Sequence, residues 1–145
     1  MAARYVYDDG GRTAAGFAAK APGDCVTRAI AIATGRDYRW VYDQINALAQ
    51  CERPRQGRSR SHARSGVYKE TWKRLLVDLG WEWVPTMRIG SGCTVHLCAE
   101  ELPPGRLIVQ VSKHVVAVID GVIFDTHDPT RDGRRCVYGF FRKRV

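Results

Sequence analysis

The chain lacks any long run of apolar residues. Across its 145 residues, no apolar stretch approaches the roughly 18 residues that a membrane-spanning helix needs. The first eleven residues contain the charged residues Arg4, Asp8 and Asp9, which does not fit the pattern of a secretion signal. We therefore expect a protein that is made and kept in a cytoplasm, with no membrane partner.

The sequence contains few cysteines, and their number is odd. Five cysteines without a secretion signal argue against a disulfide framework and for reduced thiols. The sequence also lacks a glycine-rich phosphate-binding loop of a recognised pattern and shows no internal repeat. Its length fits one domain spanning residues 1–145, large enough to bury a core without disulfides or metal.

Acidic residues are outnumbered: 23 Lys and Arg face 15 Asp and Glu, for a net charge of +8. The basic residues gather in segments 53–74 and 131–144, near Tyr68, Trp72 and Tyr138, which could stack on bases. No nucleic-acid-binding motif accompanies the charge, so solvated surface charge is the simpler interpretation. Nucleic-acid binding through the basic loop 53–74 stays open but is not favoured.

The first half of the chain predicts helices. Asp24 is a suitable N-cap, because its carboxylate can accept from first-turn amides. The buried helix that follows covers residues 25–34 and ends at Gly35. Helices are also expected over residues 39–50 and 67–79, separated by an exposed, mobile, arginine-rich loop at 52–66.

The second half predicts strands, preceded by a short strand over residues 5–7 at the N-terminus. The Val- and Ile-rich runs and their flanking turns suggest strands over residues 81–84, 106–112, 114–119, 122–126 and 136–141, with a brief helix over 94–101. Asp120-Gly121 is a two-residue hairpin signal. The expected class is α+β, with a helical N-terminal half packed on a C-terminal antiparallel β-sheet.

Cys25 opens the first helix, where the helix dipole and unpaired amides lower a thiol pKa and make a better nucleophile. Such a nucleophile needs a base, and His114 begins a predicted strand. The two-residue turn pairs Val116 with Asp125, which puts Asp125 on the face of His114, diagonal to it. A carboxylate there could hold the imidazole in one tautomer.

Two further residues follow Asp125 closely. His127 would lie directly opposite His114 in the same register, which makes it a competing base. Asp128 falls on the other face and precedes Pro129, so a turn role is expected.

The stretch Gly23-Asp24-Cys25-Val26-Thr27-Arg28-Ala29 and the hairpin over residues 114–126 together resemble the papain-like cysteine peptidase superfamily. The chain looks closest to small bacterial and phage members similar to the C39-type peptidases. The resemblance spans residues 23–126 and implies a papain-like fold with a catalytic Cys25, His114 and Asp125. It implies a cysteine protease-like thiol hydrolase that cleaves a peptide, isopeptide or other amide bond of a peptide or protein substrate through a thioester, with no cofactor or metal.

Papain-like enzymes usually place an oxyanion-stabilising glutamine before the nucleophile, and residues 16–21 contain none. Lys20 or the backbone amide of Cys25 could take that role. Two alternatives stay open. One is acyl transfer through the same thioester. The other is a catalytically weak or inactive binding protein that uses a basic surface to bind nucleic acid or a host protein.

Cys93, His96 and Cys98 are residue types that zinc accepts. Their Cys-x-x-His-x-Cys spacing matches no common closed site, and a fourth ligand is not evident. We therefore expect core cysteines and a surface histidine there, and no metal site.

Overall fold

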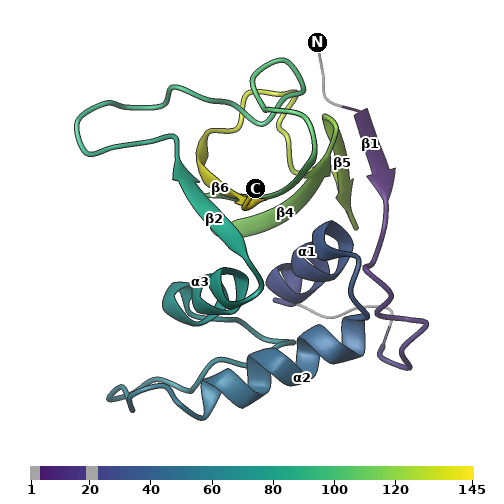
Figure 1. Ribbon diagram of the computed structural model, residues 1–145, viewed down its shortest axis with the longest axis vertical. Helices are drawn as coiled ribbons and strands as arrows, with labels where there is room; N and C mark the ends of the chain where they lie inside the picture. Colours follow the sequence, from purple (N-terminus) through teal and green to yellow (C-terminus); the bar gives the residue numbers. More distant parts are fainter. Residues whose placement is uncertain (1–3, 19–22) are drawn as a thin grey trace.

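The computed structural model describes residues 4–18 and 23–145. Within them the helices are α1 (Cys25–Thr34), α2 (Tyr38–Ala49) and α3 (Lys69–Asp78). The strands are β1 (Arg4–Tyr7), β2 (Trp81–Pro85), β3 (Arg106–Val111), β4 (His114–Ile119), β5 (Val122–Asp125) and β6 (Val137–Lys143). The predicted α+β class is confirmed (Figure 1).

The strands form one sheet in the order β1-β5-β4-β3-β6-β2. β1 runs parallel to β5, and every other neighbouring pair is antiparallel. The predicted sheet, antiparallel throughout and C-terminal, is therefore wrong in one respect. The N-terminal strand extends the free edge of β5, where Tyr5 packs against the apolar cluster on the sheet face away from the helices.

The β4–β5 hairpin has the predicted register, with Ala117 opposite Phe124 and Ile119 opposite Val122. Asp120 and Gly121 have φ values of 49° and 79°, the two positive values that a type I′ turn requires. This turn therefore brings the end of β5 beside the beginning of β4, where His114 lies.

Apolar residues cover both faces of the sheet. The three helices gather on one side (Figure 1), where Ile30 of α1 and Val41 of α2 share a core with Val115 and Ala117 of β4. On the other face, buried strand residues pack with Leu97 of the β2–β3 connection. The sheet thus holds α1 against β4, the two elements that carry Cys25 and His114.

Two local predictions are corrected. Residues 94–101 form no helix, because the amide of Leu97 donates to the carbonyl of Arg135 at 2.8 Å and His96 forms a β-bridge with Cys136. The loop 52–66 is exposed over residues 53–60, but Ala63 is fully buried. The carbonyl of Ala63 accepts a 2.7 Å hydrogen bond from the Thr27 hydroxyl, so this part of the loop packs on α1.

No helix among the described residues has both the length and the apolar character to cross a membrane.

Candidate active site

Cys25 is the first residue of α1 and is half-buried. Asp24 occupies the predicted N-cap position, but its side chain makes no capping hydrogen bond. The prediction of a capping carboxylate is therefore wrong. The amides of the first helical turn stay free of that carboxylate, and the helix still presents its positive end to the thiol.

His114, the first residue of β4, contacts both other members of the predicted constellation. Its Nε2 lies 2.6 Å from Oδ2 of Asp125, the last residue of β5. Its ring is also hydrogen-bonded to the thiol of Cys25. Because Nε2 faces the carboxylate, Nδ1 is the ring nitrogen left for the sulfur. The structure thus brings Cys25, His114 and Asp125 together, and their catalytic role stays a prediction.

The electrostatics of the three groups favour an ion pair. Burial disfavours the charged form of Cys25, but the hydrogen bond and charge of His114 outweigh it and lower the thiol pKa. Burial also opposes charge on His114, yet hydrogen bonds to Asp125 and Cys25 raise its pKa from 6.5 to about 9. The pKa of Asp125 is lowered despite its burial, chiefly by the hydrogen bond to His114. A thiolate facing an imidazolium is the form that these shifts stabilise.

A buried ionic network supports this site, and sequence reasoning missed it. Nη2 of Arg28 lies 3.1 Å from Oδ1 of Asp125, and its Nη1 pairs with Asp24. The Asp24 carboxylate also accepts from Arg12 at 3.1 Å and from the Tyr38 hydroxyl at 2.9 Å. Arg28 follows Cys25 by one helical turn, which is the only sequence signal that could have linked it to the site.

The thiol opens into a groove of about 400 Å³. Its walls are the start of α1, the segment leading into α3, and the β3–β4 hairpin: Gly23, Cys25, Val26, Gly66, Val67, Tyr68, Lys69, Trp72, Gln110, Val111, Lys113, His114 and Val115. Among the described residues that line the groove, the exposed Lys69 and Lys113 are the only charged ones besides the Cys25–His114 pair, and none is a carboxylate.

Gln110 of β3 is half-buried and lines the same groove as Cys25. Its side chain offers the amide donor that residues 16–21 lack. The sequence analysis missed Gln110 because the glutamine of papain-like enzymes is expected before the nucleophile, and Gln110 follows it by 85 positions in the chain. Of the donors predicted earlier, Lys20 lies outside the described residues. The backbone amide of Cys25 lies at the start of α1, facing out of the helix.

His127 and Asp128 lie beside the site with lesser roles. Nδ1 of His127 is 4.0 Å from Oδ1 of Asp125, and its side chain is 59% exposed. Asp128 accepts from the Thr130 amide at 2.9 Å, which confirms its turn role. His114, Asp125 and His127 are spaced as three metal ligands could be. In the structure Nε2 of His114 and Oδ2 of Asp125 are joined to each other by a 2.6 Å hydrogen bond.

The arginines of the basic loop make internal contacts. Arg60 donates to the carbonyls of Ala49, Gln50 and Glu52. Arg55 lies over the Tyr68 ring, with its Cζ 4.0 Å from the ring centroid. These contacts give two arginines of the basic loop a structural role.

The expectation of reduced cysteines throughout is wrong for two of the five. Cys93 and Cys136 form a disulfide with a Cα–Cα distance of 5.8 Å, while Cys25, Cys51 and Cys98 carry free thiols. The pair is 43 residues apart in sequence, and the β-bridge between His96 and Cys136 brings the two segments side by side.

Comparison of the chain with protein-family models, with curated proteins and with solved structures finds no match.

Proposed function

We propose that this protein is a thiol hydrolase of papain-like architecture that cleaves a peptide, isopeptide or other amide bond. The observation that carries the proposal is the position of His114 between two partners. It is hydrogen-bonded to the Cys25 thiol on one side and lies 2.6 Å from the Asp125 carboxylate on the other. A nucleophile, its base and the group that orients the base are the parts that covalent acyl transfer requires.

The reaction follows from these protonation states. The Cys25 thiolate attacks the carbonyl carbon of the substrate, and the carbonyl oxygen gains the negative charge. When the intermediate collapses, the C–N bond breaks and the His114 imidazolium gives its proton to the leaving amine. The neutral imidazole then takes a proton from water, whose oxygen attacks the thioester. The carboxylic acid leaves, and the thiolate and imidazolium are restored.

Two donors are available to the developing oxyanion. The backbone amide of Cys25 lies at the positive end of α1, and the Gln110 side chain lines the same groove. A side-chain amide in such a position is worth about 10²–10³-fold in rate in other hydrolases. Asp125 contributes by fixing the tautomer of His114, with Arg28 holding the other carboxylate oxygen at 3.1 Å.

The groove favours substrates that carry negative charge beside the scissile bond. Lys69 and Lys113 lie on the α3 side and the hairpin side of the groove, and the lining residues within 4–18 and 23–145 include no carboxylate. An acidic side chain or a free terminal carboxylate near the cleaved bond would therefore be attracted to this site.

The test is acylation by p-nitrophenyl acetate followed by peptide-level mass spectrometry. We expect an acetyl thioester on Cys25 that forms and then hydrolyses. In His114→Gln the thioester should form slowly and hardly turn over. Cys51→Ser is the matched control, since Cys51 lies outside the groove, and it should behave like the wild type. Acetylation that favours Cys51, or a Cys25 that stays unmodified, would reject the proposal and leave the binding-protein alternative.

A further inference from the structure

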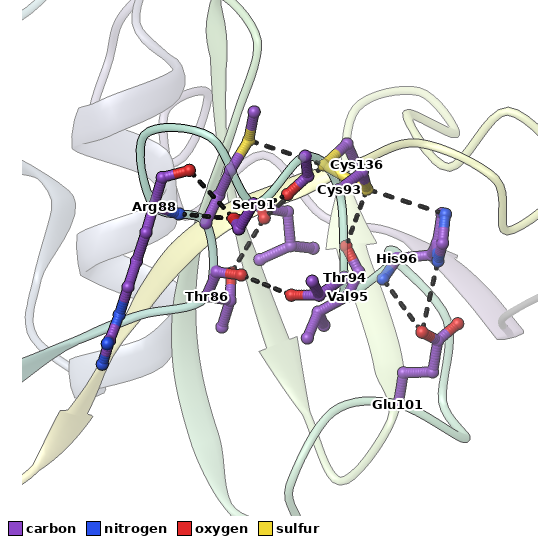
Figure 2. The surroundings of a disulfide bond; sticks show 12 residues. Thr86, Arg88, Ser91, Cys93, Thr94, Val95, His96, Glu101 and Cys136 are labelled. Atoms are coloured by element: carbon purple, nitrogen blue, oxygen red, sulfur yellow. Dashed lines mark hydrogen bonds and ion pairs between the residues drawn. A yellow bond between two sulfur atoms is a disulfide. The ribbon is translucent and has the colours of Figure 1, made fainter.

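A second group of ligating side chains lies at the Cys93–Cys136 disulfide, where Figure 2 shows His96 and Glu101 in a row beside it. Nε2 of His96 lies 3.6 Å from Sγ of Cys93. Nδ1 of the same ring lies 3.2 Å from Oε1 of Glu101. The proposed hydrolase function uses none of these residues.

Backbone hydrogen bonds hold this group together. His96 and Cys136 face each other in an antiparallel bridge. On either side of it, the amide of Val137 donates to Val95 and the amide of Leu97 to Arg135, both at 2.8 Å. Cys93 is exposed, while His96 and Cys136 are half-buried. The side chains are therefore positioned by paired backbone and still open to an ion from solution.

The orientation of the His96 ring follows from its carboxylate partner. Oε1 of Glu101 lies 3.2 Å from Nδ1 and 3.3 Å from the backbone amide of His96, and because a carboxylate oxygen accepts, Nδ1 is the ring nitrogen that donates to it. In the neutral ring the lone pair then lies on Nε2 and faces the sulfur of Cys93. A disulfide sulfur has no proton to donate to it. Histidines that bind zinc commonly donate their other ring N–H to a carboxylate in this way.

We propose that Cys93, His96 and Cys136 bind one Zn²⁺ ion when their disulfide is reduced, with Glu101 positioning His96 and water in the fourth place. Zn–S bonds of about 2.3 Å and Zn–N bonds of about 2.0–2.1 Å at tetrahedral angles put sulfur and nitrogen about 3.6 Å apart. That matches the 3.6 Å between Cys93 and His96. The two sulfurs need about 3.8 Å by the same geometry, which breaking the S–S bond permits.

This ligand set differs from Cys93, His96 and Cys98, the residues that the sequence analysis considered for zinc. The buried thiol of Cys98 lies 3.0 Å from Oε2 of Glu101. Glu101 is the partner of Nδ1 of His96, whereas Cys93 lies at Nε2. Cys98 therefore faces the positioning carboxylate and not the free ring nitrogen. Cys136, 43 residues from Cys93, takes its place.

The experiment uses the full chain with Cys25→Ser as background, so that the groove thiol cannot bind metal. A phosphine reductant cleaves the disulfide: water gives its oxygen to the phosphine and its protons to the two sulfurs. Anaerobic Co²⁺ titration then reports thiolate ligation by a charge-transfer band and tetrahedral geometry by d–d bands. We expect one Co²⁺ per chain, displaced by one Zn²⁺ with loss of the bands.

Substitutions distinguish the ligands. Cys93→Ser, Cys136→Ser and His96→Ala should each weaken binding by more than the about 10–100-fold expected for Glu101→Gln, which alters only the partner of a ligand. Cys51→Ser and Cys98→Ser are the matched controls and should bind as the background does, and circular dichroism checks that each variant is folded. The site is refuted if the reduced background chain gives no charge-transfer band at stoichiometric Co²⁺. It is equally refuted by a band that disappears in Cys98→Ser or by unchanged affinity in His96→Ala.

Discussion

Replacing Asp125 with asparagine tests how His114 is kept charged. The substitution removes the carboxylate charge at nearly unchanged size and leaves one oxygen that can accept from the ring, while the amide nitrogen takes the place of the oxygen that faces Arg28. The rise of the His114 pKa from 6.5 to about 9 corresponds to about 3 kcal/mol of preference for the imidazolium. Burial opposes this rise, and the hydrogen bonds and charges of Asp125 and Cys25 are the two favourable causes that outweigh it.

Loss of the Asp125 carboxylate should lower the midpoint of the His114 titration by about 1–3 pH units, the shift that an adjacent opposite charge commonly produces. The sign follows from the charge: without the carboxylate the imidazolium is less stable and releases its proton at lower pH. Carbon–proton correlation spectra of the histidine rings over a pH series measure this midpoint, with the His114 signal assigned by its absence in His114→Gln. The midpoint describes the coupled Cys25–His114 pair, so wild type and variant are compared under identical conditions.

Asp128→Asn is the matched control, because it makes the same chemical change in the neighbouring turn. We expect its His114 midpoint to equal that of the wild type. A midpoint that stays near 9 in Asp125→Asn would refute the assignment of Asp125 as the partner that stabilises the charged ring.

Three further substitutions test the surroundings of the site. Asp24→Asn leaves two buried guanidinium groups without their shared carboxylate and should cost about 3–5 kcal/mol in urea unfolding, whereas Asp43→Asn at an exposed ion pair should cost about 0.3–0.5 kcal/mol. Gly23→Ala places a Cβ 2.7 Å from a carbonyl oxygen of the basic loop at φ +88°, and Gly16→Ala meets nothing at φ +92°. Left-handed strain should cost both variants about 1–2 kcal/mol of unfolding free energy. Gly23→Ala should lose more than this, and equal losses in the two variants would contradict the close packing. Gln110→Leu should reduce amide turnover by about 10²–10³-fold while alkylation of Cys25 is unchanged, and full turnover would remove Gln110 from the oxyanion site.

The parts of the site that sequence could predict depend on local chemistry. Asp120-Gly121 determines the hairpin register because both residues tolerate positive φ, and that register put Asp125 beside His114. The helix-breaking residues before Cys25 and the apolar run after it predict the start of α1 at Cys25. In both cases the relevant contacts lie within about one turn or one hairpin of the chain.

The missed features depend on contacts between distant segments. Nothing near Arg12 in sequence indicates that it shares the carboxylate of Asp24 with Arg28. Residues 94–101 have a pattern compatible with a helix, but pairing of this segment with the chain around Cys136 determines its backbone. The same pairing creates the disulfide, because a β-bridge sets a partner that cysteine spacing does not reveal.

The most direct test of the account compares the iodoacetamide alkylation rates of Cys25 and Cys51 in the folded chain at pH 6. Only about 0.3% of an ordinary thiol is ionised at that pH, and Cys51 is the exposed free cysteine that serves as the reference. The account predicts that half-buried Cys25 reacts faster than Cys51 and that His114→Gln abolishes this advantage. Faster labelling of Cys51 in the wild type would contradict the claim that His114 holds Cys25 as a thiolate.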